Sequence, residues 1–487
     1  MHRLTWIWVL FIVMVFVRAA VASMKDGELA EAARPLGADL ARDLGGDGKP
    51  DLFLWLDTDG RARRMLYLDG AKGEPDVVDL NPGDLSRGPH LVIFLDGFGY
   101  DVVRAYWEEG GLRLFPPPSR VIAPYPAMTD LCLTAALGLP RCRAYEAAGF
   151  DPAANRTEGG VWDYVRGLNQ PYNRVLDYRR SPLLDGFTYL LPGCAFTSES
   201  GRCVRRFLET RRDAFFGYLV SSAGMSTRRG AEGQRQCLRR LEALLYEVVR
   251  ETRGRCTLTV LSDHGHTYTP SRPAALDREL KRKGWRLRDR LDGDRDVVSP
   301  RLGLVTYAGF WTRKPGELSS DLTGCEAVEL VSFSENGAVT VLDARGGRAR
   351  VEHRDGRFAY RQLSGDPLGL ETVLGGLHPD AEGFYDEADL FRATAAHPWP
   401  DPLRRLWRAH VDLVDKPPDV VVSLKDAWYV GSGFLSRMVS IRSTHGGLNY
   451  ANSAAFAFST AGPLPENLRT EDLPAAMRRL TGRPWPR

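Results

Sequence analysis

The chain has 487 residues, 43% of them hydrophobic and 26% charged, with a formal net charge of +3. This composition is ordinary for a folded globular protein. The length predicts either two domains or one large domain with an insertion. The near balance of charges gives no indication of a nucleic acid partner or of binding to an acidic membrane surface.

The first 22 residues have the pattern of a secretory signal peptide. His2 and Arg3 precede an apolar run at residues 5–17, and the small residues Ala20 and Ala22 follow it. A basic start, an apolar core and a small-x-small site are the three parts of such a signal. We expect cleavage after Ala22 and export to the periplasm or the extracellular space. An uncleaved N-terminal anchor is the alternative, and it would be the protein's link to a membrane.

Seven cysteines fit an oxidising compartment. Cys132 with Cys142 and Cys194 with Cys203 are close enough in the sequence to suggest local disulfide bridges. The odd number leaves at least one thiol free or paired with another chain.

Residues 23–87 predict an N-terminal extension. A helix is expected near residues 27–44, and residues 51–70 predict two strands around a turn at Asp59-Gly60.

Residues 88–284 predict the first part of an α/β core. The apolar run at 90–95, which ends in Asp96, is typical of a strand buried on both faces as it leaves a parallel sheet. Helices and strands then alternate, which predicts a mostly parallel sheet flanked by helices. The expected elements are a helix from Thr129, a strand at 215–220, an amphipathic helix at 231–251 and a strand at 256–262.

Residues 285–410 predict a small β-rich cap inserted into this core. Short alternating runs are separated by Asn336-Gly337 and Gly346-Gly347, which is typical of β-hairpins. Residues 411–487 predict the return to the core, with strands at 419–424 and 454–460.

Two of the expected strands end in residues that bind metal ions. Asp96 follows the first, and Asp263 and His264 follow the second. In an open parallel sheet, ligands bind beyond the carboxyl ends of the strands. A single Asp at a strand end is often a simple turn former. Two strand ends that deliver carboxylates and an imidazole favour a divalent metal site instead.

Thr129 is a candidate nucleophile at the start of a helix. Threonine is also a favoured N-cap, a role that needs no chemistry. The free N–H groups at a helix N-terminus would nevertheless bind a phosphoryl group. A threonine hydroxyl is a weak nucleophile unless a base or a metal activates it, and a metal at the strand ends would do so. His445, on a Gly-rich loop, is a further candidate, whereas we interpret His266 as structural.

Four segments, in this order, resemble the alkaline phosphatase superfamily, particularly its nucleotide pyrophosphatase/phosphodiesterase branch. They are LDGFGYD (95–101), YPAMTDLCLTAALGLP (125–140), LSDHG (261–265) and STHGG (443–447). The resemblance implies an alkaline phosphatase-like fold. It also implies that Asp96, Thr129, Asp263 and His264 bind one metal, with Thr129 as nucleophile, and that His445 belongs to a second metal site.

The sequence departs from this family at residues 218–230. The family usually supplies an Asp and a His there, four residues apart, as further ligands of the second metal. Counting back from Gly230 places Ala223 and Thr227 at these positions. We therefore expect the second metal to be absent and the protein to bind one divalent ion. The ligand types favour zinc, with manganese or calcium as alternatives.

Two functions are compatible with these residues. The first is a metal-dependent hydrolase of small phosphate mono- or diesters that works through phosphorylated Thr129. Arg228 and Arg229 would bind the phosphate in place of the second metal, and His445 would act as general acid or base. The sulfatase branch also keeps one metal, but its Cys/Ser-x-Pro-x-Arg motif is absent at Thr129. The second function is that of a catalytically inactive member, an exported binding or structural protein.

Overall fold

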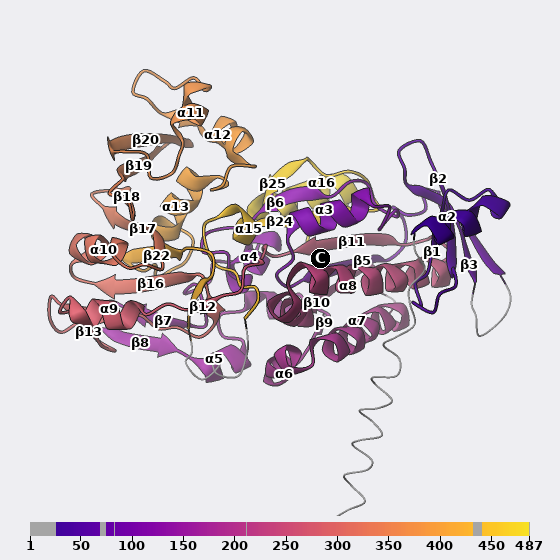
Figure 1. Cartoon of the computed structure of the whole chain (residues 1–487), viewed down its shortest axis with the longest axis horizontal. Helices are drawn as coiled ribbons and strands as arrows, with labels where there is room; N and C mark the ends of the chain where they lie inside the picture. Colours follow the sequence, from indigo (N-terminus) through magenta and orange to yellow (C-terminus); the bar gives the residue numbers. More distant parts are fainter. Residues whose placement is uncertain (1–25, 69–74, 82, 211, 432–440, 487) are drawn as a thin grey trace, which may run out of the picture.

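The computed structural model contains five β-sheets in its described residues, and the three larger ones lie with their helices along the longest axis of the molecule (Figure 1). The described residues are 26–68, 75–81, 83–210, 212–431 and 441–486. The expected signal peptide lies outside them. Within them, no helix is both long and apolar enough to cross a membrane.

The central sheet has seven strands and is mostly parallel. Its strand β24 runs antiparallel to the other six, which all point the same way. This architecture confirms the predicted α/β class. In spatial order the strands are β25 (Asn467–Arg469), β6 (Ser119–Ile122), β24 (Ala454–Ser459), β11 (Thr257–Ser262), β5 (His90–Leu95), β10 (Ala214–Leu219) and β9 (Tyr178–Arg179).

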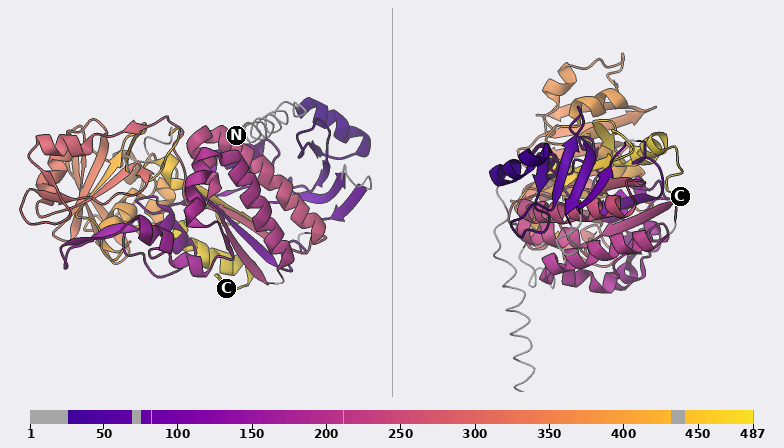
Figure 2. Two further views of the ribbon diagram at one scale, coloured as in Figure 1. Left: turned by 90° about the horizontal axis from the view of Figure 1, so that it is seen from below. Right: turned by 90° about the vertical axis from the view of Figure 1, so that its right-hand side faces the viewer.

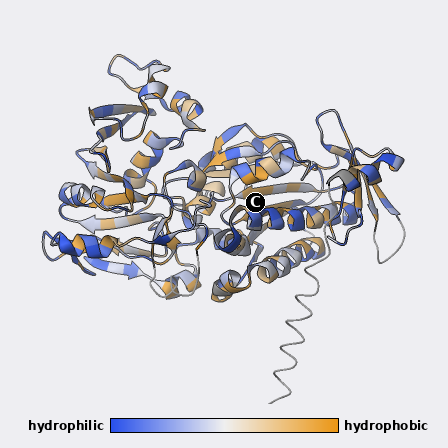
Figure 3. Ribbon diagram, viewed as in Figure 1, coloured by the Kyte–Doolittle hydropathy of each residue, from blue (hydrophilic) through white to orange (hydrophobic). Residues whose placement is uncertain are grey.

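Helices cover both faces of the central sheet, which explains why β5 is buried throughout and apolar from Leu91 to Leu95. Leu91, Ile93 and Leu95 pack on the side of α3 (Tyr100–Glu108), α7 (Pro192–Glu209) and α8 (Ser221–Glu251). Val92 and Phe94 pack on the side of α4 (Thr129–Ala136) and α16 (Leu473–Thr481). The side of α8 that faces the viewer in Figure 3 is mostly hydrophilic. The parallel strands are therefore buried on both faces, as expected of this class.

A second sheet of nine strands forms the cap. The predicted hairpin turn at Asn336-Gly337 is confirmed: both residues have positive φ angles, 50° and 75°, as a tight two-residue turn requires. The strands, in spatial order, are β13 (Arg286–Leu287), β14 (Asp296–Val298), β16 (Tyr307–Thr312), β22 (Val420–Leu424), β17 (Val328–Glu335), β18 (Ala338–Asp343), β19 (Arg348–Arg354), β20 (Arg357–Ser364) and β21 (Tyr385–Asp386).

Strand β22 was expected in the central sheet, and this prediction is wrong. It lies between β16 and β17 in the middle of the nine-stranded sheet. All five residues of β22 are buried. An apolar run reports burial on both faces, but it does not specify which sheet buries it. The cap is accordingly not small, because its sheet has more strands than the central one.

The N-terminal extension forms a separate antiparallel sheet at the opposite end of the molecule from the cap (Figure 2). The expected hairpin around Asp59-Gly60 is present. The expected helix is shorter than residues 27–44, because Pro35 and Gly37, with a φ of 64°, follow its end. The elements are α2 (Asp26–Ala33), β1 (Leu40–Arg42), β2 (Leu52–Leu56), β3 (Ala62–Leu68) and β4 (Pro75–Asp79).

Shorter elements connect these parts. Strands β12, β23 and β15 form a small sheet of their own, and β7 pairs with β8. They are β7 (Ala148–Asp151), β8 (Arg156–Gly159), α5 (Val161–Arg166), α6 (Asp185–Leu190), β12 (Arg272–Pro273), α9 (Leu276–Arg282), β15 (Leu304–Val305), α10 (Pro315–Thr323), α11 (Glu371–Gly375), α12 (Glu387–Thr394), α13 (Pro402–Val411), β23 (Trp428–Gly431) and α15 (Tyr450–Ser453).

The predicted local disulfides are wrong, since all seven cysteines are free thiols. Cys132 packs against alanines of the loop before α4, whereas the sulfur of Cys142 lies 3.3 Å from Oγ1 of Thr134. Cys194 is exposed on α7 and Cys203 is buried. Proximity in sequence did not bring either pair together.

Thiol labelling tests this arrangement. We expect one thiol, that of Cys194, to react in the native protein and all seven to react in denaturant without reductant. The variant Cys194→Ser should show no rapidly reacting thiol in the native state. Fewer than seven reactive thiols in denaturant would show that bridges exist.

Candidate metal centre and nucleophile

Asp96 and Asp263 lie side by side because of the register of two parallel strands. Leu95, the last residue of β5, is opposite Ser262, the last residue of β11. The acid that follows each strand therefore emerges at the same edge of the sheet. Ligand atoms of Asp96, Asp263 and His264 all lie within 4.8 Å of one another, and all three residues are buried.

Thr129 faces this cluster from the first turn of α4. Its Oγ1 lies 3.2 Å from Nε2 of His264. Met128, not Thr129, is the N-cap residue of α4, and no side chain caps the helix. The hydroxyl of Thr129 is thus not used to cap the helix, the role that threonine most often has at such a position.

The two carboxylates lack a positive partner among the described residues other than the His264 imidazole. Burial raises the pKa of Asp96 well above its usual value, and the charge of Asp263 raises it further. Burial also raises the pKa of Asp263 and lowers that of His264 to about 4. A neutral imidazole does not compensate two buried negative charges, whereas a divalent cation would.

Each of the three groups has one atom held by the protein and another that faces the cluster. Oδ1 of Asp263 accepts hydrogen bonds from the N–H groups of Gly97 and His264, while its buried Oδ2 has no hydrogen-bond partner and lies 3.4 Å from Nε2 of His264. The hydroxyl of Tyr218 donates to Oδ2 of Asp96. Nδ1 of His264 donates to the carbonyl of Gly265 at 2.9 Å, which leaves a lone pair on Nε2. Such outer contacts orient metal ligands, so the donor set fits a divalent ion.

The start of α8 holds the backbone of the turn after β5. Oγ of Ser222 lies 2.9 Å from the carbonyl oxygen of Asp96 and 2.7 Å from that of Leu219. Oγ of Ser226 lies 3.1 Å from the carbonyl oxygen of Gly97 and 3.0 Å from that of Ser222, so each hydroxyl shares its one proton between two acceptors. Nε2 of Gln234 also donates to the Gly97 carbonyl, at 2.8 Å. Ser222 and Ser226 belong to the turns of α8 in which the sequence lacks the expected Asp and His. Their hydroxyls contact the backbone that carries the first acid.

His445 joins the cluster from the loop before α15. Its ring stacks on that of His264, with centroids 4.0 Å apart and planes at 14°. Nδ1 donates to the carbonyl of Ala127 at 2.9 Å. The cap holds this loop, because the N–H of Thr306 donates to the His445 carbonyl at 2.8 Å. The cap therefore contributes directly to the position of a candidate site residue.

His266, which the sequence analysis interpreted as structural, also lies at the site. Its ring centroid is 5.3 Å from that of His445 and 6.2 Å from that of His264. The loop that follows β11 brings His266 there, because the N–H of Thr267 donates to the carbonyl of Thr444 at 2.8 Å, next to His445.

The predicted phosphate-binding arginines are less favourably placed. Arg229 is exposed, and its Nη1 donates to Oε1 of Gln236 at 2.6 Å. Its role in phosphate binding stays a prediction. Arg228 is half-buried, and its role stays a prediction.

Arg405, on the cap helix α13, links the loops that carry Thr129 and His445. Its Nη2 donates to the carbonyl of Pro124 at 3.3 Å, and its Nη1 donates to that of Leu448 at 3.0 Å. The guanidinium is buried, and burial lowers its pKa to about 10. This role could not be predicted from the sequence, because the contacts of Arg405 come from two distant segments, at Pro124 and at residues 448–453.

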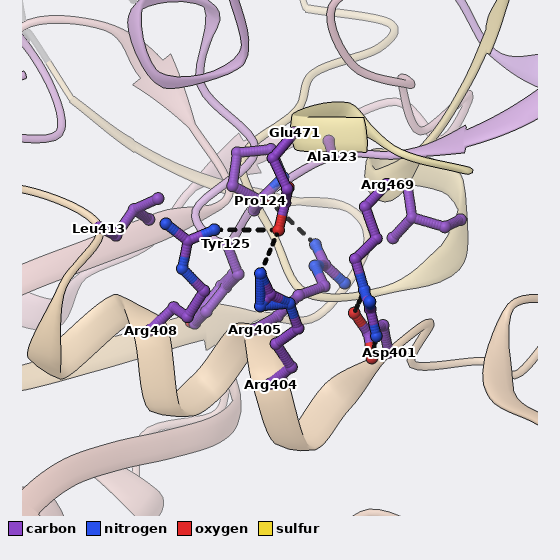
Figure 4. Close-up of a pocket in the computed structure, with 11 residues that line it drawn as sticks. Ala123, Pro124, Tyr125, Asp401, Arg404, Arg405, Arg408, Leu413, Arg469 and Glu471 are labelled. Carbon is purple, nitrogen blue, oxygen red and sulfur yellow. Dashed lines mark hydrogen bonds and ion pairs between the residues drawn. The ribbon is translucent and has the colours of Figure 1, made fainter. Parts of the chain in front are cut away.

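Ion pairs around Arg405 join the cap to the C-terminal part of the core (Figure 4). Arg404 and Arg408 of α13 each lie 2.9 Å from Oε1 of Glu471, and Nε of Arg469 lies 2.7 Å from Oδ2 of Asp401. Both partners of the second pair are buried. The cap is thus fixed to the core beside the loops of the site.

Comparisons with known proteins gave similarity only at the level of structure. No family model matches the sequence, and no curated protein is significantly similar to it. The chain is similar in structure to murine ectonucleotide pyrophosphatase/phosphodiesterase 5, with 13% identity, a TM-score of 0.45 and coverage of 82% of this chain and 96% of that one. An inactive variant of the murine protein in complex with AMP has 11% identity, a TM-score of 0.44 and coverage of 82% and 96%.

The human ectonucleotide pyrophosphatase/phosphodiesterase 5 is similar as well. It has 11% identity, a TM-score of 0.44 and coverage of 81% of this chain and 95% of that one. All three solved structures belong to the nucleotide pyrophosphatase/phosphodiesterase group that the sequence motifs resemble. At this identity the similarity assigns no residue of the site.

Zinc should stabilise the protein through the buried carboxylates. We expect chelation to lower the Tm of the wild type, because an ion that binds only the folded state stabilises it, by about 2.7 kcal/mol at a hundred times its Kd. Asp263→Asn should abolish the dependence of Tm on zinc. Asp294→Asn, at a side chain that is 68% exposed, is the matched control and should retain it. An equal response to zinc in Asp263→Asn would contradict this site.

Arg405→Met should destabilise the protein by leaving buried carbonyls without a donor. Each buried carbonyl that is left without a hydrogen-bond donor costs about 1–3 kcal/mol. Urea unfolding would measure this loss in the free energy of unfolding. Arg392→Met, at a side chain that is 75% exposed, is the matched control and should change the free energy of unfolding by less than about 0.5 kcal/mol. Equal effects of the two substitutions would refute the linking role of Arg405.

Proposed function

We propose that this protein is a metal-dependent hydrolase of phosphate mono- or diesters, with Thr129 as its nucleophile. One observation carries the proposal. The hydroxyl of Thr129, which caps no helix, lies 3.2 Å from the imidazole of His264, beside two buried carboxylates that lack a compensating charge. A threonine hydroxyl next to such a set is the arrangement that a phosphoryl-transfer nucleophile needs.

The metal would be held by Asp96, Thr129, Asp263 and His264. Two carboxylates, an imidazole and an alkoxide suit zinc first, with manganese or calcium as alternatives. When bound, the ion would supply the positive charge that favours the alkoxide form of Thr129. The free N–H groups of the first turn of α4 would face the phosphoryl oxygens.

The reaction would proceed in two displacements. Oγ of Thr129 bonds to phosphorus as the bond from phosphorus to the ester oxygen breaks, and the threonine proton goes to the leaving alcohol. Water then attacks the phosphothreonine, the bond from phosphorus to Oγ breaks, and one water proton returns to Thr129. Nε2 of His445, which has a free lone pair, would accept the threonine proton and pass it to the leaving alcohol. Arg228 would bind the phosphate, and the cap would shape the substrate pocket.

The compartment in which the enzyme works is also a proposal. The N-terminal pattern of the sequence supports export, so we propose that the enzyme works in the periplasm or outside the cell. Its substrate would then be a small phosphate ester of that compartment.

A second function has a different requirement for Thr129. An inactive, exported binding or structural protein would need Asp96, Asp263 and His264 to hold its metal, but not the hydroxyl. The hydroxyl of Thr129 lies 3.2 Å from Nε2 of His264 and does not cap α4. This placement favours the enzyme.

Thr129→Ala tests the proposal directly. We expect the zinc-loaded wild type to hydrolyse p-nitrophenyl phosphate or bis-p-nitrophenyl phosphate, and not p-nitrophenyl sulfate. The variant should lose at least about 10³-fold in kcat, as nucleophile removal does elsewhere, while its Tm still responds to zinc. Thr197→Ala, at an exposed threonine of α7, is the matched control. Unchanged turnover in Thr129→Ala would exclude this nucleophile, and a metal-loaded wild type inactive on every ester would favour the binding protein.

A further inference from the structure

We propose that a group of exposed apolar side chains in residues 161–191 docks the protein on a lipid bilayer that contains anionic lipids. The group holds seven of the eleven large apolar side chains that are exposed in the described chain. They are Val161, Trp162, Leu168, Leu183, Leu184, Leu190 and Leu191. We call them the apolar surface. This inference goes beyond the proposed function, because it concerns a contact with a membrane and not the reaction at Thr129.

The apolar surface is built from short elements that contact one another. The hydroxyl of Tyr164 on α5 donates to Oδ2 of Asp185, the first residue of α6, at 2.8 Å. The 3₁₀ turn η3 (Pro182–Leu184) packs against both helices. Helix α6 also contacts α7, and α5, α6 and α7 lie along the lower edge of the molecule in Figure 1. The seven residues are therefore neighbours in the fold as well as in the sequence.

Polar side chains of these elements point inward while apolar ones point outward. On α6, Asp185 and Thr188 are buried and Leu190 is exposed, which is the reverse of the pattern of a surface helix in water. The five most exposed residues of the apolar surface are 62–71% exposed. A single exposed apolar side chain is normal, but a group of neighbouring ones marks an interaction surface.

The residue types of the apolar surface suit the boundary of a bilayer. Tryptophan is enriched at membrane–water interfaces, and apolar side chains on the surface of a protein enter the boundary between headgroups and acyl chains by about 5–10 Å. Side chains that project from short helices and turns can be immersed in lipid directly. A protein partner would have to supply a matching pocket for each of them.

Exposed charges on the same elements and on α7 are mostly positive. The exposed arginines are Arg166, Arg174, Arg202, Arg205 and Arg206. The acids are less available: Asp185 and Glu199 are buried, and Asp177 is bound by Arg212. Asp163 lines a small cavity beside β8, and Glu209 is the last residue of α7. Anionic lipids attract such arginines, although the near balance of charges over the whole chain gave no indication of this.

The same arginines disfavour a second copy of the chain as the partner. A symmetric dimer brings the same surface of both subunits together, so it would place arginines against arginines, and like charges that face each other across an interface are costly. A bilayer with anionic lipids provides both the apolar medium and the opposite charge.

The apolar surface lies at the edge of the sheet that carries the candidate metal centre. Strand β9 runs parallel to β10 and therefore to β5, so η3 and α6, which follow β9, begin at the edge where Asp96 emerges. The carbonyl of Thr188 on α6 packs against Gly224 of α8, one turn from the serine that contacts the backbone of Asp96. A bilayer docked on this surface would therefore lie beside the candidate metal centre.

Cosedimentation of the exported protein with lipid vesicles tests this inference. We expect binding to vesicles of equal parts phosphatidylglycerol and phosphatidylcholine that is at least about tenfold tighter than to phosphatidylcholine alone. The double variant Trp162→Ser, Leu191→Ser should bind the mixed vesicles at least about tenfold more weakly. Leu36→Ser with Leu363→Ser is the matched control, because these side chains are 47% and 54% exposed outside the apolar surface, and it should bind as the wild type does.

A dye on Cys194 provides a second readout. This thiol is exposed on α7, three residues after Leu191. We expect the emission of acrylodan attached there to shift to shorter wavelength when mixed vesicles are added, because the dye enters a less polar medium. The shift should be absent in the double variant.

Each result supports or overturns the docking surface. Equal binding by the wild type and the double variant, equal binding to both kinds of vesicle, or no binding at all would overturn it. A dimer seen by light scattering in the wild type and lost in the double variant, without vesicle binding, would show that the surface joins two copies instead. Both readouts measure binding and not turnover, so an inactive protein that binds the mixed vesicles would support this surface and contradict the proposed function.

Discussion

Two buried carboxylates at the ends of adjacent strands are the constraint on which the rest of this site depends. Asp96 and Asp263 follow β5 and β11 in register, and no described arginine or lysine compensates them. Burial of like charges at this distance is unfavourable unless a cation joins them. The surrounding polar side chains are arranged so that each acid keeps one oxygen for that purpose.

The residues around the two acids are arranged to leave room for such a cation. The serines at the start of α8 hold the backbone of the first acid, and Tyr218 holds one of its oxygens. Nδ1 of His264 and Nδ1 of His445 each donate to a backbone carbonyl, which leaves the lone pair of each ring on Nε2. The site is therefore built to present lone pairs, which is a property of cation sites rather than of a hydrophobic core.

The cap is a structural part of the site as well as a cover. Arg405 and Thr306 both come from the cap, and both bind the backbone of loops that carry Thr129 or His445. The ion pairs of Glu471 and Asp401 fix the cap against the core beside these loops. A change in the position of the cap would consequently move candidate site residues that belong to the core.

The sequence alone determined the α/β class and the positions of Asp96, Asp263 and Thr129, because strand ends and helix starts are local features. It did not determine the sheet of β22, the free thiols or the role of Arg405. Apolar periodicity reports that a residue is buried, but not against what. His266 shows the same limit. Its neighbours Gly97, Ser443 and His445 come from distant segments, and only the folding of those segments onto one sheet edge brings its ring to the site.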